Sequence, residues 1–287
     1  MTISPWIYAA RPITLVASII PIVSAILILP NNINFGIFTW TLIAAIIIQI
    51  VTNYINDLFD FLKGADRNRV GPKRMLQAAL ISPLQMKKAI IILIIIGIIS
   101  GIPLAIQGGI PIIIVGLSSF LFAYLYTGGP YPLAYNGLGD IFVFIYFGLI
   151  AVSGTYFLQT GTIDISAIYL ATSIGAKNVL LLIINNIRDY KTDKIANKKT
   201  LVVSFGLYFG QCQTLLMVII SYIAMYMLAL NIEQINIFYI TIISTPLSIS
   251  ILYDTLTKTS FQLNQTLGKI SSLLILDCIL LAIGINT

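Results

Sequence analysis

Acidic and amide side chains recur at helical spacing in two stretches of the sequence, residues 53–60 and 186–193. The first stretch contains Asn53, Asn56, Asp57 and Asp60, and the second contains Asn186, Asp189 and Asp193. Because the members of each set lie three, four or seven positions from its first residue, each set would share one face of a helix. Two such faces offer the carboxylate and amide oxygens that Mg²⁺ takes as ligands.

These carboxylates need a stabilising partner, because each stretch ends a long apolar run and an Asp near a helix C-terminus opposes the helix dipole. A hard divalent cation that joins carboxylates to a substrate phosphate would supply one, and the Lys and Arg residues nearby suit a phosphate. The sequence therefore predicts a magnesium-bound diphosphate. Either stretch alone could instead be a polar helix end at a membrane boundary, but the recurrence of the pattern favours a site.

The elements that position these residues belong in a membrane. Of the 287 residues, 58% are apolar and only 9% are charged, whereas a soluble domain carries about 25% charge. This composition excludes a soluble enzyme, a disordered segment and a secreted disulfide scaffold. The sequence has no His, and Cys212 and Cys278 lie in apolar stretches without metal-site spacing, so His-dependent catalysis and His- or Cys-ligated metals are not expected.

Uncharged runs predict an all-α integral membrane protein of nine transmembrane helices. A spanning helix needs about 20 apolar residues, and the long Ile and Leu runs lack the alternation of a barrel strand. The predicted spans are residues 12–30, 36–56, 89–107, 110–127, 138–158, 165–186, 208–230, 235–253 and 267–285. We expect a single domain of residues 1–287 with two pseudo-repeat halves, because the acidic motifs at about 53–66 and 185–193 lie four spans apart.

The distribution of Lys and Arg predicts the orientation. They concentrate in the connections after the second and sixth spans, and the opposite connections contain none. Basic loops stay on the cytoplasmic side, so we expect a cytoplasmic N-terminus and site loops that face the cytoplasm of a bacterial cytoplasmic (inner) membrane. Residues 1–10 lack the basic start of a cleavable signal. The net charge of +6 then reflects topology and membrane lipid, and neither nucleic acid nor an obligate protein partner is expected.

Several short motifs extend the pattern in order along the chain. They are AARP at 9–12, NDLFDFLKGAD at 56–66, RVGPKR at 69–74, YTGGPYP at 126–132, GLGD at 137–140, NNIRD at 185–189 and KKTLVV at 198–203. Together they resemble the UbiA-type intramembrane prenyltransferases, and in detail the branch that prenylates 1,4-dihydroxy-2-naphthoate in menaquinone synthesis. The likeness runs from about residue 9 to residue 206, and beyond it only span length and hydropathy are similar.

The resemblance implies an activity: Mg²⁺-dependent transfer of an isoprenoid from a polyprenyl diphosphate to 1,4-dihydroxy-2-naphthoate, with loss of CO₂ and diphosphate, to give demethylmenaquinone. It also implies that the nine helices are bundled around a central cavity that opens to the lipid. Matched positions assign the metal ligands, which are Asn56, Asp57, Asp60, Asp66, Asp189 and Asp193. In the wider superfamily pattern a further Asp would fall at Gly64, so Asp66 would substitute for it from the loop.

The remaining candidates would contact the diphosphate, the acceptor or the allylic cation. The diphosphate set is Asn53, Arg11, Lys63, Arg69, Arg74, Asn186 and Lys198. The acceptor and cation-stabilising set is Tyr126, Tyr131 and Asp140. Each type has a simpler interpretation as well: attraction to anionic lipid for the basic residues, the interfacial belt for the Tyr residues and a helix cap for Asp140.

Alternatives stay open for two charged residues within spans and for the function. Lys177 and Asp277 could pair, Lys177 could hold the acceptor carboxylate, or it could extend toward the membrane surface. The same fold could use 4-hydroxybenzoate, homogentisate or a phytyl donor, although Gly128–Tyr131 lacks the basic residue expected for 4-hydroxybenzoate. A cation-coupled transporter would place carboxylates at the midplane, whereas these gather at one boundary. A degenerate lipid-binding scaffold would not need intact Asp pairs.

Overall fold

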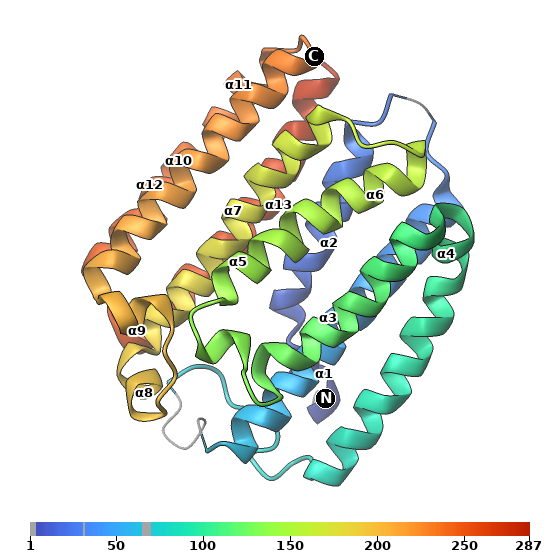
Figure 1. The fold of residues 1–287 in the computed structure, drawn as a ribbon. Coiled ribbons are helices and arrows are strands. Elements are labelled where there is room, and N and C mark those ends of the chain that lie inside the picture. Colours follow the sequence, from blue (N-terminus) through green and yellow to red (C-terminus); the bar gives the residue numbers. More distant parts are fainter. Residues whose placement is uncertain (1–3, 31, 65–69) are drawn as a thin grey trace.

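The computed structural model describes residues 4–30, 32–64 and 70–287, and every regular element within these ranges is helical (Figure 1). The predicted all-α membrane class is confirmed. The N-terminal half contains α1 (Pro5–Ala10), α2 (Pro12–Leu27), α3 (Phe35–Leu62), α4 (Pro83–Thr127), η1 (Leu133–Tyr135), α5 (Gly139–Val143), the π-helical segment η2 (Phe144–Ile150) and α6 (Ala151–Thr160). The C-terminal half contains α7 (Ile165–Arg188), α8 (Tyr190–Ile195), α9 (Leu201–Phe205), α10 (Leu207–Asn231), α11 (Asn236–Thr241), η3 (Ile242–Ser244), α12 (Thr245–Thr257), η4 (Ser260–Gln262) and α13 (Leu263–Ile285).

Side-chain caps set where several of these helices begin. At the start of α4 the Ser82 hydroxyl accepts from the Gln85 backbone N–H, and the Gln85 side chain accepts from the Ser82 N–H. Asn34 and Asp164 cap α3 and α7 with their own side chains. These bonds satisfy N–H groups that have no partner inside a helix.

Helix α4 is two arms joined at Gly109. Gly109 has φ 64° and ψ −152°, a combination that only glycine adopts readily. Figure 1 shows the two arms running antiparallel on either side of this break. The break lies in the turn predicted between the spans 89–107 and 110–127, and the glycines in the sequence were the signal for that turn.

Seven helical segments of the described residues are long and apolar enough to cross a membrane, with α4 counted as one and α2 as a shorter apolar helix. The count of nine spans, the cytoplasmic N-terminus and the pseudo-repeat division of the single domain therefore stay predictions.

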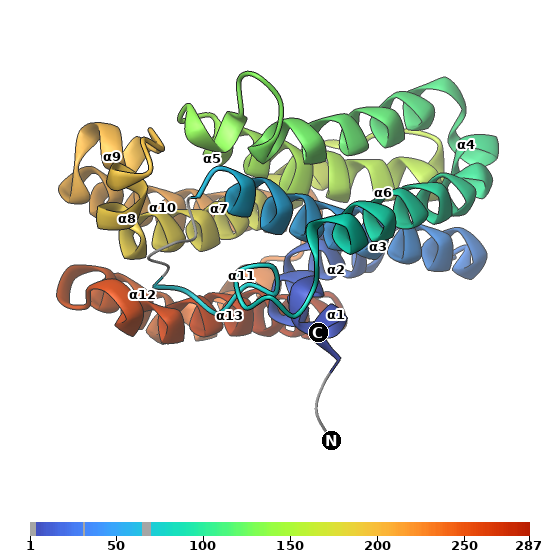
Figure 2. The same cartoon turned by 90° about the horizontal axis from the view of Figure 1, so that it is seen from below.

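Helix α7 occupies the centre of the bundle and is the most buried of the candidate spans. It packs against α10, α13 and η2, and Figure 2 shows it between α13 and the second arm of α4. A Cβ at Gly148 of η2 would lie 2.6 Å from the Gly175 Cα of α7, so small residues allow these two backbones to touch. This packing fixes the C-terminal end of α7, which carries Asn186. The second acidic set was predicted on one helix, but it is divided: α7 ends at Arg188, Asp189 lies in the break that follows, and Asp193 lies in α8.

Candidate active site

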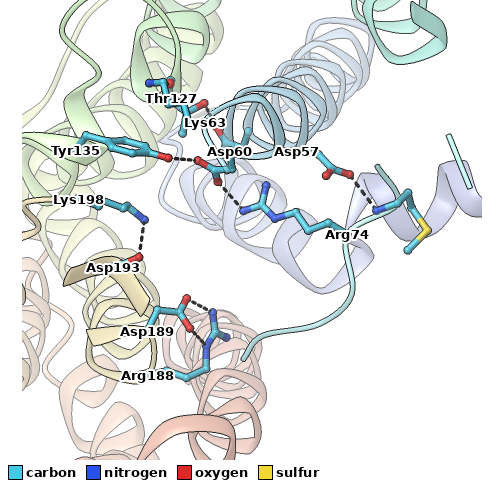
Figure 3. Close-up of polar contacts among 12 residues, drawn as sticks. Asp57, Asp60, Lys63, Arg74, Thr127, Tyr135, Arg188, Asp189, Asp193 and Lys198 are labelled. Carbon is cyan, nitrogen blue, oxygen red and sulfur yellow. Dashed lines mark hydrogen bonds and ion pairs between the residues drawn. The ribbon is translucent and has the colours of Figure 1, made fainter. Parts of the chain in front are cut away.

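A polar cavity of about 180 Å³ lies where α3, α4 and α7 end. Asp60 of the first acidic motif and Asp189 and Asp193 of the second line the same cavity, although more than 120 residues separate the two motifs in the sequence. Figure 3 shows the three carboxylates together with the cationic side chains that contact them. The two helix ends that the sequence predicted to converge are thus brought together.

The Asp60 carboxylate has two donors, one on each oxygen. The Arg74 Nη2 donates to Oδ2 over 2.8 Å, and the Tyr135 hydroxyl donates to Oδ1 over 2.7 Å. Both Asp60 and Arg74 are buried, so this ion pair lies in a medium that screens charge weakly. Arg74 follows α3 in the chain and returns to its end, which explains why a basic loop lies beside the first motif.

Asp57, one position from Asn56, faces a different part of the chain. Its Oδ2 accepts from the Met75 backbone N–H over 3.2 Å, and the residue does not line the polar cavity. In Figure 3 the Asp57 carboxylate points away from Asp60. Its contact with Met75 attaches the loop to α3, and its assignment as a metal ligand stays a prediction.

The second motif contains one neutralised and one partly paired carboxylate. Arg188 donates from Nε and Nη2 to the two oxygens of Asp189, at 2.8 and 2.6 Å, and donates from Nη1 to Asn264 Oδ1. Asp193 has Lys198 Nζ at 3.6 Å from Oδ1, and its buried Oδ2 has no hydrogen-bond partner among the described residues. Burial raises the pKa of Asp193 to about 6, against the opposing effect of Lys198.

Tyr135 joins the two motifs, and sequence reasoning missed it. Its hydroxyl contacts Asp60, while Lys63 Nζ lies 4.4 Å and Lys198 Nζ lies 5.7 Å from the centre of its ring, within the range of a cation–π attraction. Lys63 also donates to the Thr127 carbonyl over 2.6 Å, and burial lowers its pKa, against the opposing effect of Asp60.

Most predicted site residues line the polar cavity. They are Arg11, Asn56, Asp60, Arg74, Tyr126, Asp140, Asn186, Asp189, Asp193 and Lys198. Four others do not: Asn53, Asp57, Lys63 and Tyr131. Asn53 instead lines the apolar cavity described below and donates to the Ala10 carbonyl over 2.8 Å, and Tyr131 is 60% exposed. Asp66 and Arg69 lie outside the described residues.

The junction between α1 and α2 directs Arg11 to this cavity. Arg11 has φ 51°, a left-handed conformation that is uncommon for a residue with a side chain. Pro12 follows as the first residue of α2, where its missing N–H costs nothing. A strained non-glycine backbone at a cavity wall is typical of a functional position.

A larger, mainly apolar cavity of about 480 Å³ adjoins the polar one. The two share four lining residues: Asn56, Tyr126, Leu182 and Asn185. The larger cavity extends between α2, α3, both arms of α4, α6 and α7. A ligand with an anionic head and a long apolar tail could therefore occupy both cavities at once.

The model of the UbiA prenyltransferase family matches residues 18–273. The chain belongs to the UbiA prenyltransferase family. It is 34% identical over 212 residues to the 1,4-dihydroxy-2-naphthoate octaprenyltransferase of Mycobacterium leprae, with 70% of this chain and 69% of that protein covered. It is 32% identical over 267 residues to the enzyme of that name from Haemophilus influenzae, with 89% and 86% covered. The predicted family resemblance is thus confirmed.

Solved UbiA structures share this fold. A UbiA homologue from Archaeoglobus fulgidus bound to GPP and Mg²⁺ superposes with a TM-score of 0.70 at 18% identity, over 99% of this chain and 100% of that one. The apo structure of a homologue from Aeropyrum pernix gives a TM-score of 0.71 at 12% identity, over 94% and 97%. The family match, the named relatives and the apolar helices together make this UbiA-family protein a multi-pass membrane prenyltransferase.

The oxygen atoms that line the polar cavity are suitable ligands for a hard cation. The cavity wall supplies carboxylate and amide oxygens, and Asp193 Oδ2 and Asp140 Oδ1 are buried without a hydrogen-bond partner among the described residues. Oxygen atoms of this kind are the ligands of Mg²⁺. Within the described part of the chain, no three acidic or Cys residues already stand close enough to form a metal centre, so the carboxylates would need a phosphate or water to complete one.

The sequence contained signals for the site residues that were missed. Asn185 and Arg188 belong to the NNIRD motif but were not singled out; Asn185 lines both cavities and Arg188 holds Asp189. Tyr135 lies just before GLGD, in the short connection from α4 to α5 that passes over the site. The sequence alone does not predict whether a Tyr in such a connection faces lipid or the site.

The two charged residues within spans form a pair away from the cavities. Lys177 Nζ lies 2.5 Å from Asp277 Oδ2 and donates to the Ser173 hydroxyl over 3.0 Å. Both side chains are buried, and neither lines a cavity described above. Of the three interpretations open for Lys177, the structure shows the pairing, which joins α7 to α13.

Proposed function

We propose that this protein transfers a polyprenyl chain from its diphosphate to 1,4-dihydroxy-2-naphthoate, releasing CO₂ and diphosphate and forming demethylmenaquinone. The observation that carries the proposal is that two cavities, one rich in carboxylates and cations and one apolar, lie next to each other and share four lining residues. Relatives at 30–34% identity that bear the name of this activity support the choice of acceptor.

In this proposal the residues of the polar cavity bind the diphosphate head. Arg11, Arg74 and Lys198 line it and would contact phosphate oxygens, with Asn186 beside them. Asn56, Asp60, Asp189 and Asp193 would hold Mg²⁺, which supplies positive charge for the departing diphosphate when bound. Arg74 and Arg188 neutralise Asp60 and Asp189 in the structure and line the same cavity, so both guanidinium groups would also lie beside the bound anion.

The prenyl carbon that loses the diphosphate would develop positive charge at the junction of the cavities. Tyr126 lines both cavities there, so its ring can stabilise this charge by cation–π attraction. The apolar cavity would exclude water from the cation, which favours attack by the aromatic acceptor over hydrolysis. Asp140 lies in the polar cavity wall and would orient the acceptor.

The polar cavity would open toward the cytoplasm of a bacterial inner membrane, where both diphosphate and naphthoate are soluble. The supporting observation is the sequence asymmetry: Lys and Arg flank this end of α3 and α7, and the connections at the opposite end contain none.

A reconstituted assay tests the proposal. The protein in lipid nanodiscs is supplied with the naphthoate, a polyprenyl diphosphate and Mg²⁺, and the product is measured by mass spectrometry. We expect demethylmenaquinone, no product with EDTA, and little product from 4-hydroxybenzoate or homogentisate. A preference for either of these two acceptors, or for a phytyl donor, would replace the proposed substrate and keep the reaction class.

Two variants and one control test the site. We expect Asp60→Asn and Asp193→Asn to lose at least 100-fold in turnover, since each removes a carboxylate that would hold the Mg²⁺. Asp164→Asn is the matched control, because Asp164 caps α7 at an exposed position and Asn caps helices as well as Asp does. If both Asp variants turned over as fast as the Asp164→Asn control and the wild type, the polar cavity would have no part in the reaction.

A further inference from the structure

The larger cavity has one wall with free hydrogen-bonding capacity. On the α4 and α6 side, the Ser119 and Thr155 hydroxyls donate to carbonyls of their own helices. The side formed by α2, α3 and α7 instead presents Gln49 and Asn178, two amide side chains that face α2. An isoprenoid has no use for amides, so this wall suits a more polar ligand.

Asn178 carries the clearest signal. It is 2% exposed, and its Nδ2 lies 3.4 Å from both the Ala17 and the Phe147 carbonyl oxygens. Its Oδ1 is buried and has no hydrogen-bond partner among the described residues. Rotating the amide by half a turn would place Oδ1 against two carbonyl oxygens, so the donors fix its orientation. A buried acceptor without a donor is costly, and a ligand hydroxyl would satisfy it.

Gln49 lines the same cavity and, like Asn178, contacts α2. Its Nε2 is 3.5 Å from the Thr14 hydroxyl, and Thr14 precedes Ala17 on α2 by three residues, which is about one helical turn. Asn178 is also two turns, about 10 Å, before Asn185 on the same face of α7. Asn185 lines both cavities, so Asn178 lies about two helical turns from the junction.

We propose that this amide wall, Gln49 and Asn178, binds the aromatic acceptor, with Asn178 Oδ1 accepting a hydrogen bond from a ring hydroxyl. The ligand class is a planar aromatic that carries at least one hydroxyl. The prenyl tail then lies along the apolar α4 and α6 side, and the two substrates meet at the junction. This inference rests on the proposed function for the identity of the second substrate.

A binding experiment without donor or Mg²⁺ separates the inference from catalysis. Protein in nanodiscs is titrated with 1,4-dihydroxy-2-naphthoate and with 2-naphthoate, which lacks both hydroxyls. We expect the wild type to bind the hydroxylated compound more tightly. Asn178→Ala should weaken its binding about 3- to 10-fold, the usual effect of one neutral hydrogen bond, and leave 2-naphthoate binding unchanged. Ser119→Ala is the control on the opposite wall and should change neither.

The kinetics of the same variants supply a second readout. Asn178→Ala should raise the KM for the acceptor and leave the KM for the prenyl diphosphate unchanged. Equal weakening of both naphthoates would make Asn178 a purely structural residue and overturn the inference, as would a wild type that does not distinguish the two compounds. The comparison of the two compounds on the wild type needs no variant, so it tests the inference even if Asn178→Ala does not fold.

The two proposals fail separately. A protein that shows the expected hydroxyl preference at Asn178 but forms no prenylated naphthoate would contradict the proposed function and keep the amide wall as a binding site for hydroxylated aromatics. A protein that forms the product with an unchanged acceptor KM in Asn178→Ala would keep the function and place the acceptor elsewhere.

Discussion

At Asp193, a proton and a metal ion would compete for the same carboxylate. Burial raises its pKa to about 6, so the carboxyl is mainly protonated below that pH and ionised above it. A cation binds only the ionised form. The apparent affinity for Mg²⁺ should therefore be full above about pH 6 and fall as the pH decreases, by up to about tenfold per pH unit for one displaced proton.

Calorimetric titration of the nanodisc protein with Mg²⁺ between pH 5 and pH 8 measures this dependence. Asp193→Asn removes the titrating group and should flatten the profile while weakening binding at every pH. A wild-type affinity that does not change across the range would show that Asp193 takes no part in metal binding.

Tyr135 should contribute through its hydroxyl and its ring separately. Tyr135→Phe removes a hydrogen bond to the Asp60 carboxylate and keeps the ring beneath Lys63 and Lys198, at a cost of about 1.5–3 kcal/mol for a bond to a charged group. Tyr135→Leu also removes the two cation–π contacts, for about 0.5–1 kcal/mol more each. Thermal unfolding in detergent should rank wild type above Phe and Phe above Leu; identical Phe and Leu variants would mean that the ring holds neither Lys.

The sequence predicted which residues belong to the site better than it predicted which partners they contact. Periodicity placed Asp60 correctly on α3, because spacing within one helix is a local property. It also placed Asn186 and Asp193 on one helix, whereas the structure breaks the helix at Asp189 and puts Asp193 in α8. Periodicity also placed Asp57 on the same stripe as Asp60, yet Asp57 contacts Met75. Asp57 and Asp60 lie three positions apart, which is about 60° around the helix, and which of them meets the cavity depends on how the helix is rotated by its packing. No local pattern reports that rotation.

The break in α4 makes a clear prediction for an element. Gly109→Ala places a Cβ in a backbone conformation that only glycine adopts readily, and no atom lies within 4 Å of that Cβ, so backbone strain alone would act. We expect a loss of about 1–3 kcal/mol. Gly116→Ala is the control: its site is equally open but lies inside the second arm, where Ala is favoured over Gly by about 1 kcal/mol. The midpoint temperature of thermal unfolding should fall for Gly109→Ala and rise for Gly116→Ala.

The pair between α7 and α13 tests how a buried charge is tolerated. Lys177→Met leaves Asp277 buried without its partner, which costs about 3–5 kcal/mol in comparable pairs. The double variant Lys177→Met with Asp277→Leu removes both charges and should recover most of that stability. Unfolding measurements on the two single variants and the double variant complete the cycle; a double variant as unstable as the sum of the singles would mean that the charges do not interact.

Sequence reasoning located elements well where a local signal exists and poorly where it does not. The turn at residues 107–109 contains two glycines and coincides with the break in α4. The π-helical turn Phe144–Ile150 was not predicted, because its residues are ordinary apolar ones and the distortion accompanies the close contact of Gly148 with α7. Helix α4 also begins at Pro83, six residues before the predicted span. The prediction began only after Lys87 and Lys88, because it was based on uncharged runs, and the first turns of this helix are polar.

For the molecule as a whole, two halves of the chain must assemble before either cavity exists. The polar cavity takes residues from positions 11 to 201, and the larger cavity takes residues from α2 through α7. Helix α7 contributes to both and contacts helices from both halves. The last helices, α10 to α13, line neither cavity and cover α7 and α2 from outside. The later helices still supply polar contacts to this arrangement, since Asn264 of α13 accepts from Arg188 and Asp277 of α13 pairs with Lys177.

The arrangement of the chain across the membrane follows from the two arms of α4. If each arm crosses once, residues on either side of the hairpin share a compartment and its tip lies in the other. Single Cys residues at Lys87, Ile110 and Tyr131, all exposed, report this in a background without Cys212 and Cys278. Because basic loops stay in the cytoplasm, a membrane-impermeant maleimide added to intact cells should label position 110 alone, and positions 87 and 131 only after permeabilisation. Labelling of 87 and 131 from opposite sides would mean that α4 crosses once, and the nine-span topology with its cytoplasmic site would then be wrong.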